Sequence, residues 1–244
     1  IMAFGDDFTT PEKDGFASGE EIRWRVFCWN VEEEYSLMPE YDPAMPQTNG
    51  TYLSFGISGV LSLEAYITAG VELSEGWSGF SLPVTPFEQD LDVLFDAVME
   101  DMVVLRNSSQ IFWPAMNINT FNGWEADYAA ALKMESTGVL TIPGIPDTDQ
   151  EIELQQGWNY LPVITNCNIA VSDLAATVPE GIEMIKEIAG YRIYWPAQGI
   201  ATLEVLEVGK AYLIRLANDL TLSFPPCTDA QPTSLSYTVP ASWN

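Results

Sequence analysis

Alternating apolar and polar positions mark the first seventy residues of the chain. Between residues 21 and 29 every second side chain is apolar and falls on one face: Ile22, Trp24, Val26 and Cys28. A period of two over this length predicts a half-buried β-strand. Three further segments have a similar composition and predict more strands: Val31–Tyr35, Tyr52–Phe55 and Leu61–Thr68. We expect residues 1–70 to be the second half of a β-sandwich-like domain, with its opening strands upstream or in another chain.

A helical pattern follows. Apolar residues recur three and four positions apart at Leu91, Leu94, Phe95, Val98 and Met99. This spacing predicts an amphipathic helix that packs on a sheet. The preceding Thr85-Pro86-Phe87-Glu88 has the residues of a capping box with proline at the first helical position, so we expect the helix to begin there. A shorter stripe of the same kind comprises Val171, Leu174, Ala175 and Val178.

The segment 76–142 recurs at 157–224. Gly76-Trp77 matches Gly157-Trp158, and the IFWPA motif at 111–115 matches IYWPA at 193–197. From Met102 to Pro143 we expect a constant offset of 82 residues. A duplication of this size indicates two structural modules, each predicted to contain a strand, a helix and four strands.

The expected fold class is therefore mostly β with minor α (α+β). We place the first repeat at residues 71–145 and the second at 150–227, joined by a short linker at 143–149. Residues 228–244 are rich in Pro, Ser and Thr. They are expected to be a linker, or to begin a following strand at Ser234–Val239.

The balance of charge excludes two classes of partner. Of the 244 residues, 9 are Lys or Arg and 35 are Asp or Glu, which gives a net charge of −26. Such a field repels nucleic acid and anionic lipid, and no apolar stretch reaches the ~20 residues that span a bilayer. We expect neither nucleic-acid binding nor membrane insertion. The dispersed acidic residues are most simply a solvated surface.

The absence of histidine removes several kinds of chemistry. With 0 His, nucleophile systems that use Ser-His-Asp or Cys-His are excluded, together with histidine metal sites. The three cysteines, Cys28, Cys167 and Cys227, are too few and too dispersed for a zinc site.

Several motifs resemble a known group of proteins. They are GWNYLPV (157–163), IKEIAGYRIYWP (185–196) and EVGKAYLI (207–214). This paired pattern resembles tandem modules of large secreted surface proteins of Bacteroidota, and residues 5–20 with WRVF (24–27) look like a β-domain that often precedes them. The resemblance implies export by the type IX route and a role in adhesion, matrix or surface scaffolding. It brings no catalytic residues. The first repeat departs from the pattern at 124–128, where WEADY replaces the Gly-Lys turn at 209–210, so this loop is expected to differ in shape.

An acidic loop is the candidate metal site. Five carboxylates fall within fifteen residues: Asp6, Asp7, Glu12, Asp14 and Glu20. Calcium prefers such hard oxygen ligands. The spacing is not that of an EF-hand, because Thr10 stands where the first Asp belongs, and a solvated turn is the simpler interpretation.

Aromatic residues are candidates for glycan contact. Trp124 and Tyr128 lie in the loop that differs between the repeats and are less constrained by the repeat, so they are the first residues to test for contact with a sugar. The Trp113-Pro114 and Trp195-Pro196 pairs could form a similar platform. Because the repeat places these two tryptophans alike, a role in the core or between modules is the simpler interpretation.

Cys167 and Cys227 stand at the two ends of the second repeat and have no counterpart in the first, where Pro86/Phe87 and Gly144/Ile145 fall instead. A pair gained together suggests a disulfide, as in an oxidising location. Two buried thiols are the alternative.

These observations lead to a functional expectation. The chain is predicted to be a non-catalytic, extracellular structural or adhesive module of a multidomain bacterial surface protein or filament. Its expected partners are neighbouring modules, identical subunits or surface glycans, and its one candidate cofactor is calcium. A lectin-like glycan-binding module is the first alternative. A glycoside hydrolase is the second, although nothing in the sequence brings two carboxylates together as that chemistry requires.

Overall fold

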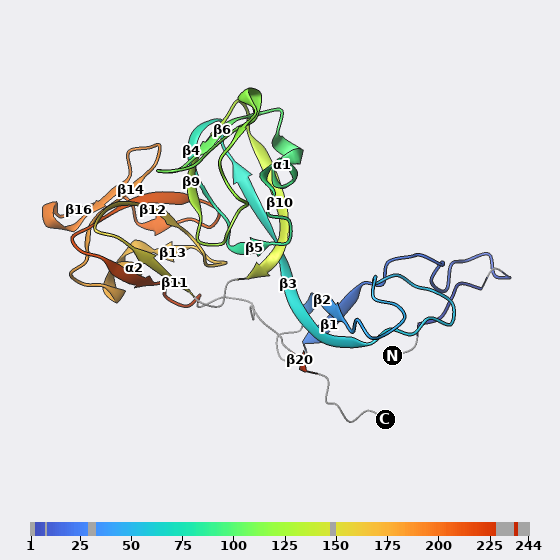
Figure 1. Cartoon of the computed structure of the whole chain (residues 1–244). Helices are drawn as coiled ribbons and strands as arrows, with labels where there is room; N and C mark the ends of the chain where they lie inside the picture. The colour runs from blue at the N-terminus through green and yellow to red at the C-terminus, as the bar shows by residue number, and fades with distance from the viewer. Residues whose placement is uncertain (1–2, 8, 29–32, 147–149, 228–236, 239–244) are drawn as a thin grey trace. The chain divides into compact units, whose positions relative to one another are not determined.

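A computed structural model describes residues 3–7, 9–28, 33–146, 150–227 and 237–238 (Figure 1). Strands predominate and the helices are short, which confirms the predicted mostly β class with minor α. Contacts divide the chain into two units, one of residues 1–66 with 234–244 and the other of residues 67–233. The predicted boundary at residue 70 falls inside one continuous strand, β3 (Val60–Leu73).

The first unit contains an antiparallel sheet. Its strands are β1 (Trp24–Cys28), β2 (Glu33–Tyr41), the first part of β3 and β20 (Tyr237–Thr238). β1 pairs with β2, β2 with β3, and β20 with β3 at Leu63 and Ser62. Part of the predicted strand Ser234–Val239 thus pairs with β3 of its own chain. The described residues of this unit contain one sheet, and the second sheet of the expected sandwich stays a prediction.

The second unit contains both repeats. The first repeat adds these elements to the end of β3: β4 (Gly76–Ser81), β5 (Val84–Pro86), α1 (Leu91–Leu94), η1 (Asp96–Val98), β6 (Met102–Arg106), β7 (Ile111–Trp113), η2 (Pro114–Met116), β8 (Ile118–Asn119), β9 (Ala129–Met134) and β10 (Gly138–Pro146). The second repeat comprises β11 (Glu151–Leu154), β12 (Gly157–Pro162), β13 (Ile169–Ala170), α2 (Val171–Thr177), β14 (Ile182–Glu187), β15 (Ile193–Trp195), η3 (Pro196–Gln198), β16 (Ile200–Ala201), β17 (Val205–Leu206), β18 (Ala211–Leu216) and β19 (Leu220–Ser223).

The two repeats share the topology of their main sheet. Each forms a five-stranded antiparallel sheet, in the order β4-β9-β6-β7-β8 in the first and β12-β18-β14-β15-β16 in the second. Each repeat also has a ribbon of strands outside this sheet: β3 with β10, which pairs further with β5, in the first repeat, and β11 with β19 in the second. The predicted linker at 143–149 begins too early, because β10 extends to Pro146, and the sequence pattern did not predict β11.

The offset between the repeats is not constant. Leu105 pairs with Leu132 in the first sheet, and Ile185 pairs with Ile214 in the second. Leu105 and Ile185 are therefore equivalent although they lie 80 residues apart, whereas Leu132 and Ile214 lie 82 apart. The difference arises in one hairpin. It is closed by Asn107 N–H donating to Gln110 O in the first repeat, and across the longer 187–192 loop in the second. The predicted gapless match is wrong at this turn.

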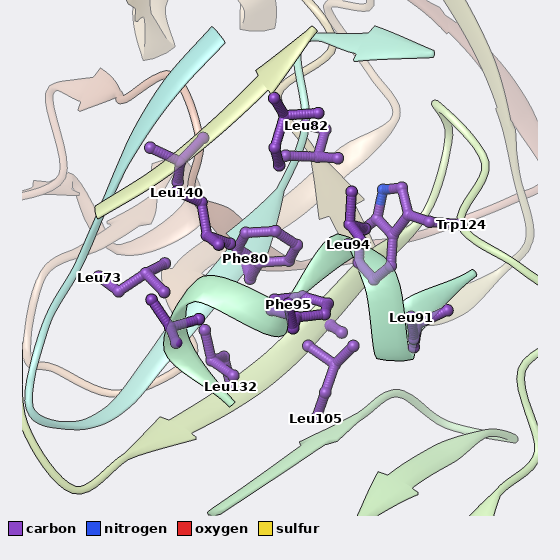
Figure 2. Close-up of a cluster of buried hydrophobic side chains, with 14 of the residues drawn as sticks. Leu73, Phe80, Leu82, Leu91, Leu94, Phe95, Leu105, Trp124, Leu132 and Leu140 are labelled. Atoms are coloured by element: carbon purple, nitrogen blue, oxygen red, sulfur yellow. The ribbon is translucent and has the colours of Figure 1, made fainter. Parts of the chain in front are cut away.

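The core of the first repeat lies between the sheet, the ribbon and the helix (Figure 2). Phe80 from β4 contacts the rings of Phe95 and Trp124, with centroids 5.3 Å and 5.0 Å away. Leu73 and Leu140 enter from the ribbon. The second repeat has its own buried cluster, built from equivalent elements. Each repeat thus buries an apolar core of its own, which is what makes it a module.

The helix of the first repeat begins later than predicted. Asp90 is its N-cap, and the Asp90 carboxylate accepts a hydrogen bond from Asp92 N–H at 2.9 Å. The predicted start lies instead in β5, where Thr85 pairs with Ile145 of β10. Pairing with a neighbouring strand satisfies this backbone better than a helical turn would. The apolar stripe itself was predicted correctly, since Leu91, Leu94, Phe95 and Val98 are buried.

A disulfide joins Cys167 to Cys227, with Cα atoms 5.8 Å apart, as predicted. The same place in the first repeat is closed by backbone pairing between β5 and β10, where Pro86 faces Gly144. The second repeat has no strand equivalent to β5 among its described residues. A covalent link therefore takes the place of a strand pair. Among the described residues, no helix is long and apolar enough to cross a membrane.

Candidate functional site

The two repeats contact each other through small residues on β4 and β9. A Cβ atom on Gly79 would lie 1.8 Å from the carbonyl oxygen of Ala211, so the two backbones approach as closely as glycine allows. Ala129 and Ala131 lie on the same face of this sheet as Gly79, and both are buried. The approach joins the repeats backbone to backbone.

Ser81 forms hydrogen bonds across this junction. Its hydroxyl donates to the carbonyl oxygen of Lys210 at 2.6 Å and accepts from Val163 N–H at 3.0 Å. The Ser81 backbone N–H donates to Gly209 O at 3.2 Å. The side chain is completely buried, so each of these hydrogen bonds is shielded from water.

The loop that receives Ser81 is held in place by charge. Glu207 forms ion pairs with Lys210 and, at 2.9 Å, with Arg192. The Lys210 ammonium, followed by Arg192, lowers the pKa of Glu207. The Tyr212 hydroxyl accepts a hydrogen bond from Glu207 N–H at 2.9 Å, and burial raises the pKa of Tyr212 to about 12. The carbonyl groups of Gly209 and Lys210 are thereby presented to Ser81.

The contacts between the repeats are reciprocal. β4 of the first repeat contacts β18 of the second, and their equivalents β12 and β9 contact each other as well. The residues at the two contacts nevertheless differ, because Pro162 stands where the first repeat has Ser81. Proline has no N–H and no hydroxyl, so it cannot make the hydrogen bonds that Ser81 makes. One side of the junction is closed, and the other side opens into a cleft.

This inter-repeat cleft has a volume of about 640 Å³. That size lies within the range of ligand sites, about 300–1,000 Å³. It is lined from the first repeat by Asn107, Ser108, Asp127, Tyr128 and Ala129, and from the second by residues 151–156, Trp158, Asn159, Tyr160 and Pro162. The described lining contains three aromatic rings and three carboxylates but no Lys or Arg. It is the strongest candidate for a binding site in the second unit.

The structure places the two predicted glycan-contact residues, Trp124 and Tyr128, in different surroundings. Trp124 is 0% exposed, and its ring contacts those of Phe80 and Tyr128. The prediction that Trp124 stacks on a sugar is therefore wrong, because the residue belongs to the core. A signal for this was present, since the equivalent position is the apolar Leu206, which is also fully buried. Tyr128 is half-buried and lines the inter-repeat cleft.

The acidic loop uses its carboxylates within the loop. Asp6 accepts hydrogen bonds from the N–H groups of Asp14 and Gly15, and Asp7 accepts from Thr9. Glu20 pairs with Lys13 at 2.7 Å. Within the described ranges, Glu12 and its acidic neighbours are not gathered into a group of three that could hold a metal ion. Calcium at this loop stays a prediction.

The two Trp-Pro pairs lie outside the buried clusters. Trp113 is 37% exposed and Trp195 is half-buried, and each precedes a 3-10 turn that begins at the proline. The turns end in the left-handed conformation at Asn117 and Gly199, with φ of 52° and 64°. The interpretation of these tryptophans as core residues is wrong, because the side chain of Trp113 is exposed and that of Trp195 is half-buried, whereas a role between modules stays a prediction.

The sequence did not single out the residues of the inter-repeat cleft on β12. Trp158, Tyr160 and Pro162 belong to the GWNYLPV motif at 157–163, and that motif does not indicate a binding site. The signal lay in the alignment of the two copies, where Tyr160 and Pro162 replace Gly79 and Ser81. A change from small to large residues at a junction marks the position where the copies cannot pack alike.

Comparisons of the chain with protein-family models, with curated proteins and with solved structures found no match.

Proposed function

We propose that the chain is a non-catalytic structural and adhesive module of a multidomain extracellular protein. The resemblance to tandem modules of Bacteroidota surface proteins exported by the type IX route supports this proposal. So does the disulfide between Cys167 and Cys227, because such bonds persist in oxidising surroundings. The acidic surface suits a protein that stays soluble outside the cell.

The junction between the repeats is the observation that carries the proposal. Gly79 and Ala211 meet at the backbone, and buried Ser81 hydrogen-bonds to two segments of the second repeat. Modules strung on flexible linkers would need no such contact. A close-packed junction keeps the spacing of the two repeats constant, which is the property that a spacer or adhesin stalk requires.

Force spectroscopy on single molecules tests this role. The full chain is pulled between two reference domains, and its second unit, residues 67–233, is expected to resist force and to unfold in one step. In non-reducing buffer the disulfide withholds the segment between Cys167 and Cys227, a sequence separation of 60, which shortens the extension by roughly 200 Å. Two separate, weak unfolding steps would contradict a structural role.

The hydrolase alternative has a direct test as well. Glycans incubated with the chain are expected to remain intact when the products are analysed by mass spectrometry. Cleavage would make the protein an enzyme and would direct attention to the carboxylates of the inter-repeat cleft, Asp127, Glu151 and Glu153.

A further inference from the structure

We propose that the inter-repeat cleft is a binding site for a neutral saccharide. The inference rests on the proposed function, since it names the class of ligand through which the module adheres. Four observations carry it: an aromatic pair that includes an exposed tryptophan, unpaired polar groups beside it, the sign of the charge, and the contrast with the first repeat.

The aromatic pair lies on β12. Trp158 and Tyr160 are two residues apart and so project from the same face of the strand, roughly 7 Å from one another. Trp158 is 51% exposed and Tyr160 is half-buried. Tyr128 enters the same cleft from the first repeat. A pyranose ring presents a flat face of C–H groups, which an aromatic ring can cover while the hydroxyl groups point outward.

The polar groups of the inter-repeat cleft divide into two sets. One set maintains its shape: Asn159 donates to Gln155 O at 2.7 Å, and Asn107 donates to Gln110 at 3.0 Å. The side chains of the second set make no hydrogen bond within the described part of the chain: Ser108, Asp127, Glu153 and Gln155. They can therefore bind sugar hydroxyl groups without breaking a bond of the protein.

The charge of the cleft selects the type of sugar. Asp127, Glu151 and Glu153 line it, and its described lining contains no basic side chain. Uronic acids, sulfated sugars and phosphates would be repelled at close range, in addition to the repulsion from the net charge of −26. Carboxylates are good hydrogen-bond acceptors for neutral hydroxyl groups, so the site fits a neutral saccharide.

The first repeat offers a matched comparison. Trp77 occupies on β4 the place that Trp158 occupies on β12, and it is 40% exposed. The guanidinium of Arg106 covers the Trp77 ring at 5.4 Å, and Gly79 replaces the second aromatic residue. Trp77 does not line the inter-repeat cleft. Trp77 is therefore an exposed tryptophan at the equivalent strand position that does not contact the inter-repeat cleft, which makes it a matched control for Trp158.

The test is a glycan array of neutral, acidic and amine-bearing saccharides, followed by calorimetry with the strongest neutral hit. The whole chain is expected to bind a neutral saccharide. Trp158→Ala and Tyr160→Ala should each weaken binding by at least about tenfold, whereas Trp77→Ala should change it less than twofold. Circular dichroism verifies that each variant is folded.

Three results would overturn the inference: an array on which no neutral saccharide binds, binding of acidic or amine-bearing sugars alone, or equal losses in Trp158→Ala and Trp77→Ala. The force measurement separates this inference from the proposed function. A blank array with one-step unfolding rejects the sugar site and retains the structural role. Binding of a neutral saccharide together with two weak unfolding steps retains the sugar site and rejects the structural role.

Discussion

Gly79 of the first repeat and Ala211 of the second lie so close that no side chain fits between them, since a Cβ atom on Gly79 would come within 1.8 Å of the Ala211 oxygen. The atoms it would meet belong to the backbone of β18, which cannot move without disturbing the sheet. Whether the two repeats act as one body depends on this contact.

Gly79→Ala should therefore destabilise the second unit by at least about 2 kcal/mol, the cost of forcing extra volume into a packed site. Urea denaturation followed by tryptophan fluorescence measures it. Gly70→Ala is the matched control, because Gly70 also lies in a strand and nothing stands within 4 Å of its Cβ position. It should change stability by less than about 1 kcal/mol. Equal effects would show that the close approach does not matter.

Ser81→Ala should lower the free energy of unfolding by about 1–3 kcal/mol, because it leaves the N–H of Val163 buried without a partner. Ser78→Ala on the same strand is the control, since the Ser78 side chain makes no hydrogen bond in the described residues. Thermal and urea unfolding of the two variants give the comparison. If Ser78→Ala were the more damaging change, the junction would not depend on the hydroxyl.

Removal of the disulfide should destabilise the second repeat by about 2–4 kcal/mol. The double variant Cys167→Ala/Cys227→Ala tests this, with dithiothreitol treatment of the wild type as an independent route to the same state. The reductant should have no further effect on the double variant. A wild type whose unfolding midpoint is unchanged by reduction would show that β-strand contacts alone close this repeat.

Stability should decrease above pH 10 because of Tyr212. Its pKa is raised from 10.0 to about 12 in the folded protein, so the folded state holds a proton that the unfolded state has lost. This contribution is complete below pH 10 and disappears as the pH rises to about 12. Tyr212→Phe should flatten the decrease, whereas Tyr191→Phe, at a fully exposed ring, should retain it. Urea titrations at successive pH values provide the measurement, and a similar slope in both variants would refute the assignment.

Much of the fold was accessible from the pattern of residues. The internal repeat predicted two modules of like topology, and the stripe at 91–98 predicted the buried face of α1, because periodicity reports which side chains face a core. The residue at which that helix begins could not be predicted from the sequence. Thr85 and Pro86 have the residue types of a helix cap, but they pair with β10 in a sheet instead. The local sequence does not show a pairing with a strand that is distant in the chain.

Most of the candidate site could not be predicted from the sequence, for a related reason. Cys167 and Cys227 could be paired because both were absent from one copy. Trp124 was assigned to the surface because the loop sequence differs between the copies, whereas its equivalent Leu206 shows that the position itself is apolar. The inter-repeat cleft depends on how the two repeats pack, and only Tyr160 and Pro162 hinted at it.

The reciprocal contact between the repeats has an evolutionary consequence. Two identical subunits related by a two-fold axis share one interface, so a single substitution alters both of its halves at once. When the copies belong to one polypeptide, each half can change independently. Ser81 makes the hydrogen bonds of a tight contact, while Pro162, its counterpart, cannot make them. A homodimer would have to open both halves or neither, whereas this fused pair keeps one for cohesion and can give the other to recognition.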